Sequence, residues 1–249
     1  MGKIFTTLWL TVLCFLLLGD VYAWEVPSYL RMSGGSRAWF TSVRGDLIQP
    51  DLTKIDLGTN LGVKPDALSW EFFGSIRLEN IHVLRCRVEP ETLYAQAKNE
   101  SLHKVRNIRA GYDLDFYMTP QMLVGANVDL DVLTIESRVK DVTVGVMHFT
   151  YNQDQTRLVP SVGIHGTFYP IVEGIALRPN VSARCGWFSY EGLESWDWEA
   201  VTGVDIPINR LWTWSVSTGY RGWYTRFKRG RDTVDMRRNG LFVETSILF

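Results

Sequence analysis

Four aspartates could hold a cation, because they alternate with apolar residues in two neighbouring segments of the chain. Asp113 and Asp115 share one parity of the first segment, and Asp129 and Asp131 share one parity of the second. Carboxylate oxygens are ligands that Ca²⁺ prefers, so a calcium site is one interpretation. Arginines in the adjacent segments explain the cluster as well, by ion pairing, and we favour this second interpretation.

A hydrolytic centre would need a nucleophile, a base and an acid within reach of one another. His165 shares a parity with Ser161 and Thr167. Such neighbours are commonplace on a strand, and no serine lies in a strained or glycine-rich elbow. The other three histidines are scattered, and no Cys/His spacing suggests zinc. We therefore expect neither catalytic residues nor a metal or cofactor, and keep a lipid-modifying enzyme as an alternative.

These side chains lie in segments with a period of two, which is typical of β-strands. Between Arg210 and Lys228, Trp214 and Val216 share one face, whereas Ser215 and neighbours of its parity share the other. The segment exceeds the roughly 9–11 residues that a tilted strand needs to cross a bilayer. The same alternation predicts ten strands, at residues 32–46, 68–79, 82–95, 102–118, 121–136, 156–169, 174–188, 194–207, 210–227 and 234–249.

The connections between these segments alternate between short and long. Those near 79–81, 119–120, 170–173 and 208–209 are tight, whereas most of the others are longer and more polar. Short turns at one rim and long loops at the other are typical of membrane barrels. We therefore predict an all-β fold, a single antiparallel up-and-down transmembrane β-barrel of about ten strands. Counts of eight or twelve strands remain as alternatives, because valines within 137–155 indicate a strand extension or an extra hairpin.

The first 23 residues have the pattern of a secretory signal peptide. Lys3 precedes an apolar stretch from Ile4 to Leu18, and Val21 and Ala23 are small residues at the positions that a signal peptidase needs. The stretch is short for an uncleaved membrane anchor. We therefore expect a signal peptide at 1–23 and a barrel domain at 24–249.

The composition excludes some classes of partner. The net charge is −1, so no strong field favours nucleic acid. After the signal peptide the only cysteines are Cys86 and Cys185, which we expect to be unpaired rather than bridged. Nine of the ten tryptophans follow the signal peptide, yet no later stretch approaches the roughly 18 apolar residues of a helical span.

The last strand carries the most specific pattern. The chain ends at Phe249, and Leu241, Val243 and Ile247 share its parity. This ending resembles the terminal signature of bacterial outer-membrane proteins, although Ile247 stands where an aromatic is common. The layout resembles the small barrels of the OmpA, OmpX and OmpW type. The resemblance implies a location in the bacterial outer membrane, contact with its lipids, and recognition of Phe249 and Ile247 by the barrel-assembly machinery.

A soluble barrel of the lipocalin kind would show the same alternation with its apolar face turned inward. Four features favour a membrane barrel instead: the long strands, the short turns at one rim with long loops at the other, the terminal Phe, and the aromatics at strand ends. Aromatic side chains prefer the two interfaces of a membrane. The residues that we place near the outer rim are Trp187, Trp196, Trp198 and Tyr224. Those that we place near the periplasmic rim are Phe116, Phe168, Trp212, Trp214 and Phe249.

If the apolar face meets lipid, the other face fills the lumen with charge. Unpaired charges in a narrow interior are costly, so we expect them to pair. The short turn at 119–121 should set Arg109 opposite Asp131, and Arg184 should face Asp197 or Glu199. The predicted network contains Arg85, Arg87, Arg109, Asp113, Asp115, Asp129, Asp131, Arg178, Arg184, Asp197, Glu199, Asp205, Arg221 and Glu244, with Glu71, Arg77 and Glu89 as further candidates.

A lumen plugged by these side chains is the interpretation that we favour, with a narrow channel for small polar solutes as the alternative. We therefore expect a structural or surface-exposed role, with the loops near 47–67 and 137–155 making outside contacts. That expectation depends on the family resemblance and not on a site. No motif in the sequence indicates a ligand.

Overall fold

The computed structural model describes residues 30–48, 54–56, 66–95, 102–144, 147–170, 177–209, 211–229 and 232–249, so the predicted signal peptide lies outside the described residues. Every regular element in these ranges is a β-strand. No helix among them is long and apolar enough to cross a membrane. The strands are β1 (Leu30–Ile48), β2 (Lys54–Asp56), β3 (Asp66–Leu78), β4 (His82–Ala95), β5 (Leu102–Met118), β6 (Met122–Val144), β7 (Met147–Phe168), β8 (Arg178–Tyr190), β9 (Leu193–Pro207), β10 (Thr213–Arg229) and β11 (Asp232–Leu248).

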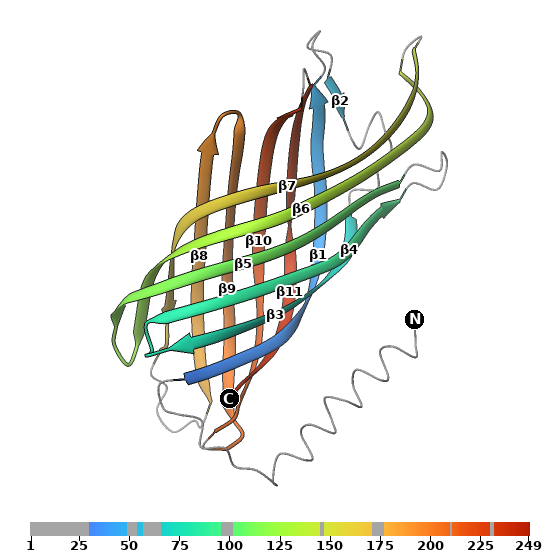
Figure 1. Ribbon diagram of the computed structural model, residues 1–249. Helices are drawn as coiled ribbons and strands as arrows, with labels where there is room; N and C mark the ends of the chain where they lie inside the picture. The colour runs from blue at the N-terminus through green and yellow to red at the C-terminus, as the bar shows by residue number, and fades with distance from the viewer. Residues whose placement is uncertain are drawn as a thin grey trace.

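Ten of these strands form a closed antiparallel barrel (Figure 1). Each of the ten pairs with the barrel strands before and after it in the chain, and β11 pairs with β1 to close the sheet. The short strand β2 is not one of the ten, so β1 pairs directly with β3. Among the described strands, β2 pairs only with the end of β1. The predicted fold class and the predicted count of ten strands are therefore confirmed.

The start of β1 and the end of β11 lie at the same rim of the barrel, which we call the terminal rim. The opposite rim is the far rim. Backbone hydrogen bonds of 2.7 and 2.8 Å join Met32 and Phe249 there. Glu79 and Asn80 have positive φ angles of 50° and 62°, the conformation that a tight two-residue hairpin needs. Glu191 and Gly192 repeat this geometry at the far rim, where they join β8 to β9.

The two longest strands are β6, with 23 residues, and β7, with 22. They pair with each other as far as Val144 and Met147, so the stretch 137–155 extends one hairpin and adds no new one. The alternative of an extra hairpin is wrong. Figure 1 shows this hairpin reaching well beyond the neighbouring strands at the far rim.

The two faces of each barrel strand differ sharply. On β5, Ile108 and Leu114 are 49% and 38% exposed, whereas Arg109 and Asp113 are each 4% exposed. A β-bulge after Asp115 breaks this alternation, because it adds one residue to β5 against β6. Tyr117, which has the parity of Asp113 and Asp115 in the sequence, is therefore exposed like its neighbour Phe116.

Candidate functional site: the barrel lumen

A chain of ion pairs crosses the lumen between opposite walls. Arg109 on β5 binds both carboxylate oxygens of Asp131, with Nε–Oδ1 and Nη2–Oδ2 distances of 2.7 and 2.8 Å, and also contacts Asp197 on β9. Arg221 on β10 continues the chain: its Nη2 lies 3.0 Å from Asp197 and its Nη1 lies 2.7 Å from Glu71 on β3. All five side chains are buried. The chain therefore ties five strands together through the interior.

Arg37 extends this central layer to β1 and β11. Its Nη2 lies 2.6 Å from Glu244, and its Nη1 lies 3.0 Å from Glu199 and 3.5 Å from Glu71. Arg87 on β4 approaches the same two glutamates, at 3.5 Å from Glu199 and 3.8 Å from Glu71. Charged groups in a low-dielectric interior need such partners, because an unpaired charge there costs several kcal/mol.

A second cluster lies below this layer, toward the terminal rim. Arg85 on β4 contacts Asp113 at 2.8 Å and Asp129 at 2.7 Å. Arg184 on β8 contacts the same two aspartates from across the lumen, at 2.7 and 3.6 Å. Gly111 leaves room for the Arg85–Asp129 ion pair, because a Cβ at this position would lie 2.1 Å from Asp129 Oδ1 and 2.8 Å from Arg85 Nη2. A side chain at position 111 would therefore displace the ion pairs.

Asp115 lies at the end of this charged region. His165 Nε2 contacts Asp115 Oδ1 at 2.7 Å, and Arg77 binds its other oxygen. The Nδ1 atom of His165 is buried and has no hydrogen-bond partner in the described part of the chain. Among the described residues, no hydrogen bond joins His165 to Ser161 or Thr167, so the geometry is a histidine–carboxylate pair with neither hydroxyl bonded to it.

Each of the four aspartates considered as calcium ligands has a basic partner in these clusters. Within the described part of the chain, no group of three or more His, Cys, Asp or Glu side chains is placed to hold a metal ion. Ion pairing accounts for the cluster.

Toward the far rim, the lumen filling changes from ionic to apolar. Trp39 marks the boundary, because the guanidinium groups of Arg221 and Arg238 lie 5.0 and 4.6 Å from its ring centroid. Arg238 also binds Glu89 at 2.9 and 2.5 Å, and Ser69 donates to the same carboxylate at 2.7 Å. Beyond them, a cluster of buried side chains occupies the interior, which we call the apolar core: Val43, Val105, Leu133, Ile135, Val159, Trp223, Phe227 and Met236.

Some predicted members of the network have other partners than expected. The register sets Arg109 opposite Asp131, as the turn length predicts, and Arg184 opposite Glu199. Arg184, however, donates across the lumen to Asp113 and not to its neighbour on β9. Its long side chain crosses the interior because Arg37 and Arg87 already bind Glu199.

Two predicted members lie apart from the buried ion pairs. Arg178 is exposed at the terminal rim, where it lies 4.0 Å from the Tyr169 ring centroid and donates to the carbonyl of Pro120. Asp205 accepts hydrogen bonds from Asn180 at 3.1 Å and Ser215 at 2.6 Å. Both lie near strand ends, where water reaches the lumen and the need for an ionic partner is weaker.

Two central arginines, Arg37 and Arg238, were not among the predicted residues. Arg238 has the inner parity of Glu244 on the last strand, so alternation alone could have found it. Around Arg37 the signal is weaker, because Gly34, Gly35 and Ser36 blur the apolar alternation of β1.

The aromatic residues predicted at the rims form rows on the outer face. Trp187 pairs with Trp196, which lies 6.3 Å from Tyr224, and Trp198 stacks on Tyr220 at 5.5 Å. Tyr224 is largely covered by these contacts and by Arg237, so it is 9% exposed.

A second aromatic row lies at the terminal rim. Trp212 stacks on Phe249 at 5.3 Å, and Trp214 Nε1 donates to Thr245 at 2.7 Å. Phe116 and Phe168 are 65% and 49% exposed. Cys86 and Cys185 are both free, as predicted, and both are exposed.

No family model matches the chain, and no curated protein matches it. Similar solved structures include the outer membrane protease OmpT from Escherichia coli, at 7% identity over 90% of this chain and 97% of that one, with a TM-score of 0.47. The translocator domain of the autotransporter NalP from Neisseria meningitidis has 7% identity over 97% and 96% of the chains, with a TM-score of 0.43. Neisserial surface protein A has 13% identity over 88% and 96%, with a TM-score of 0.35.

Proposed function

We propose that this protein is a bacterial outer-membrane β-barrel with a structural or surface-exposed role, whose lumen is closed to solutes. The observation that carries the proposal is the inverted distribution of side chains. Buried arginines and carboxylates fill the interior, while each of the ten barrel strands turns large apolar side chains outward. A water-soluble protein rarely exposes a contiguous apolar patch above a few hundred Å².

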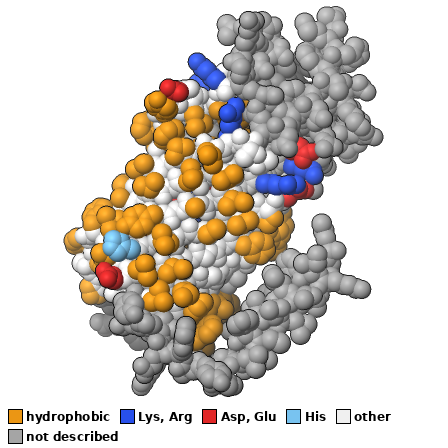
Figure 2. Space-filling model, in the orientation of Figure 1, with side chains coloured by type: hydrophobic (Ala, Val, Ile, Leu, Met, Phe, Trp, Pro, Cys, Tyr) orange, Lys and Arg blue, Asp and Glu red, His pale blue; other side chains and the backbone are white. Residues whose placement is uncertain are grey.

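The outer flank supports contact with membrane lipids. Figure 2 shows apolar side chains spread over the visible flank of the barrel, with charged side chains mostly near its ends. The exposed fractions of Leu158, Val162 and Ile164 are 60%, 60% and 61%. A closed barrel leaves no unpaired sheet edge over most of its wall, and this is a condition for crossing a bilayer with strands.

The choice of the outer membrane has further support in the chain. Residues 1–23 have the pattern of a signal peptide, the barrel has an even number of strands, and the strand that closes it, β11, is followed by the aromatic Phe249. We propose that the barrel-assembly machinery recognises this final strand during biogenesis. The projecting β6–β7 hairpin is then the best candidate for contacts outside the cell.

The lumen contacts support a plug over a channel. Solute flow along the axis would have to break the Arg109–Asp197 and Arg221–Glu71 contacts and displace the apolar core beyond them. Side chains just fill the interior of barrels of about eight strands, and ten strands leave little more room.

Fractionation and electrophoresis test the location. The mature protein should be found in outer membranes, need detergent for extraction, and migrate differently on gels before and after boiling. A mature chain that is soluble and monomeric without any amphiphile would contradict the proposal.

Planar bilayers test the closed lumen. Protein whose insertion is verified by its heat-dependent mobility should give no channel openings, while an open porin in the same bilayers serves as the positive control. Regular unitary openings would support the narrow channel instead.

We propose no catalytic role, and His165 provides the sharpest test of this point. Of the two histidines whose side chains the structure describes, it is the one that contacts a carboxylate, that of Asp115. The His165→Ala variant should leave the lipid A and phospholipid composition of the cells unchanged, as judged by mass spectrometry of extracted lipids. A changed acylation pattern, in a variant that still shows heat-dependent mobility, would indicate a lipid-modifying enzyme.

A further inference from the structure

The barrel wall is open between β7 and β8 on the side of the far rim. The two strands pair over seven residues of β7 only, from Val162 opposite Trp187 to Phe168 opposite Val181. By contrast, β7 pairs with β6 along its whole length, from Phe168 to Met147, apart from one irregularity. Above Val162, β7 therefore follows β6 while β8 follows β9, and the two hairpins part.

The sequence favours this split. Pro160 has no N–H to donate, so within a sheet proline is confined to an edge, a strand end or a bulge. It lies on β7 just beyond the last pair with β8, while its partner on β6 is Leu130. The tight Glu191–Gly192 turn also ends the β8–β9 hairpin early, whereas β6 and β7 continue.

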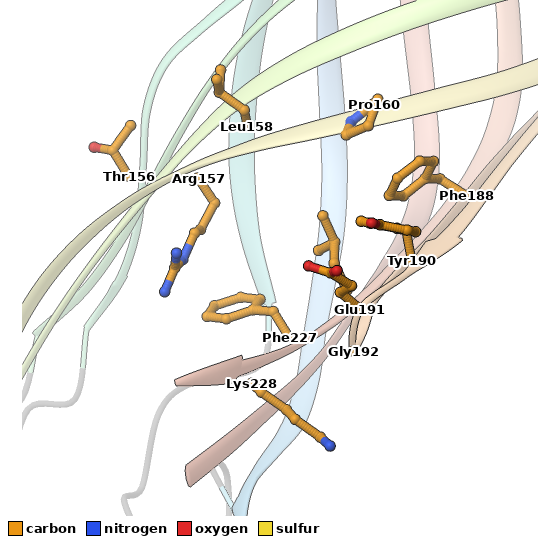
Figure 3. Close-up of a pocket in the computed structure, with 11 residues that line it drawn as sticks. Thr156, Arg157, Leu158, Pro160, Phe188, Tyr190, Glu191, Gly192, Phe227 and Lys228 are labelled. Carbon is orange, nitrogen blue, oxygen red and sulfur yellow. The ribbon is translucent and has the colours of Figure 1, made fainter. Parts of the chain in front are cut away.

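A cleft of about 530 Å³ occupies the split. In Figure 3, Leu158 and Arg157 of β7 line one side, and Phe188 and Tyr190 of β8 lie on the other. Leu158 belongs to the outer flank and is 60% exposed, whereas Phe227 at the base of the cleft is 4% exposed and belongs to the apolar core. The cleft thus leads from the outer surface of the barrel to its apolar interior.

The charges at the cleft are unevenly distributed. Arg157 and Lys228 are cationic, and Glu191 is the one acidic residue among the described lining residues. The guanidinium of Arg157 lies 5.7 Å from the Phe227 ring centroid, so a cation borders the apolar base directly. The Lys228 stem lies beside Gly192, where a Cβ would lie 3.0 Å from Lys228 Cδ. An occupant would therefore meet apolar walls and a net positive rim.

We propose that this cleft binds one acyl chain of a membrane lipid whose anionic headgroup is held by Arg157 and Lys228. A volume of about 530 Å³ falls within the usual 300–1,000 Å³ of small-ligand sites. A peptide strand fits the edge less well, because Pro160 offers no donor. The location supports a lipid too, since Trp187 and Trp196 of the aromatic row lie at the same level of the barrel.

Two phospholipids with identical acyl chains provide the first test, since only their headgroups differ. Native mass spectrometry of the full mature protein, released from neutral detergent, counts bound dioleoyl phosphatidylglycerol and dioleoyl phosphatidylcholine. We expect at least a fivefold preference for the anionic lipid, which the Arg157→Gln/Lys228→Gln variant should abolish. Arg226→Gln is the matched control, because Arg226 is an exposed cation of the same strand and parity as Lys228 but does not line the cleft.

Photocrosslinking locates the bound chain. Phosphatidylglycerol with a diazirine at the end of its acyl chain should label peptides that contain Phe188, Leu193 or Phe227 in preference to the flank around Ile164. The inference rests on the membrane location proposed above, so only protein with heat-dependent mobility is used. Loss of that mobility would overturn the proposed function itself. A preference that survives in the double variant, or labels spread evenly over the flank, would overturn the lipid site alone.

Discussion

The two halves of the lumen are filled by different kinds of side chains, which exclude water in different ways. Toward the far rim, Leu133, Trp223 and their neighbours exclude water by apolar contact, which has no strict geometry. Toward the terminal rim, arginines and carboxylates exclude water only as matched pairs, since each charge without a partner would be strongly unfavourable. Removal of one side chain should therefore leave a cavity in one half and a stranded charge in the other.

The largest effect is expected in the charged half, for Arg221→Met. Methionine keeps much of the volume but removes the 3.0 Å contact of Asp197 and the 2.7 Å contact of Glu71. Among the described residues, Asp197 then keeps only Arg109, and Glu71 keeps only the more distant Arg37 and Arg87, at 3.5 and 3.8 Å. Breaking a buried pair costs about 3–5 kcal/mol, and we expect the upper end of this range because two carboxylates are affected. The free energy of unfolding is measured by urea titration in neutral detergent, with tryptophan fluorescence as the signal.

Two variants control this measurement. Neutralising both carboxylates in Arg221→Met/Glu71→Gln/Asp197→Asn should recover more than half of the loss, because no charge is then stranded. Arg106→Met removes an arginine from the outer face of β5, where its side chain is 54% exposed, and should cost below about 1 kcal/mol. An Arg221→Met variant as stable as Arg106→Met would show that the ionic half does not hold the barrel together.

The pairs within this half show how far the sequence could be used. Alternation assigns inner and outer faces, and a short turn sets the register, so Arg109 opposite Asp131 was predictable from local geometry. The contact of Arg109 with Asp197 joins residues 88 apart in the chain. Such contacts depend on how the sheet closes and on which rotamers fill the interior, and neither follows from spacing along a strand.

The apolar core was also missed, although a signal for it exists. Leu133 has the inner parity of Asp131, and Trp223 has the inner parity of Arg221. In both strands, and again from Arg238 to Met236, the inner face changes from charged to apolar toward the far rim. A comparison of inner positions by height, after the strands are aligned, would have predicted the core, because neighbouring strands must fill the same layer.

A smaller effect is expected in the apolar half, for Leu133→Ala. Leu133 is 1% exposed within the apolar core, and its truncation leaves a cavity without any stranded charge. Such substitutions cost about 2–5 kcal/mol, and we expect the middle of this range. The urea titration used for Arg221→Met applies unchanged.

Leu130→Ala is the matched control for this prediction. Leu130 lies on the same strand but faces outward with 43% exposure, so its truncation leaves no internal cavity. We expect it to cost clearly less than Leu133→Ala. Equal losses for the two variants would mean that the interior near the far rim is loosely packed.

The smallest effect concerns Trp39, at the boundary between the halves. Its ring faces the guanidinium groups of Arg221 and Arg238 at 5.0 and 4.6 Å, and cation–π contacts contribute from about 0.5 kcal/mol at exposed sites to about 2 kcal/mol or more when desolvated. A double-mutant cycle of Trp39→Leu with Arg238→Met isolates this contribution, since the cavity and the lost Glu89 pair cancel in the cycle. We expect a coupling of about 1–2 kcal/mol. A coupling near zero would mean that the indole acts only as an apolar side chain that fills space. The charged half would then end at Arg221 and Arg238, and Trp39 would belong to the apolar half alone.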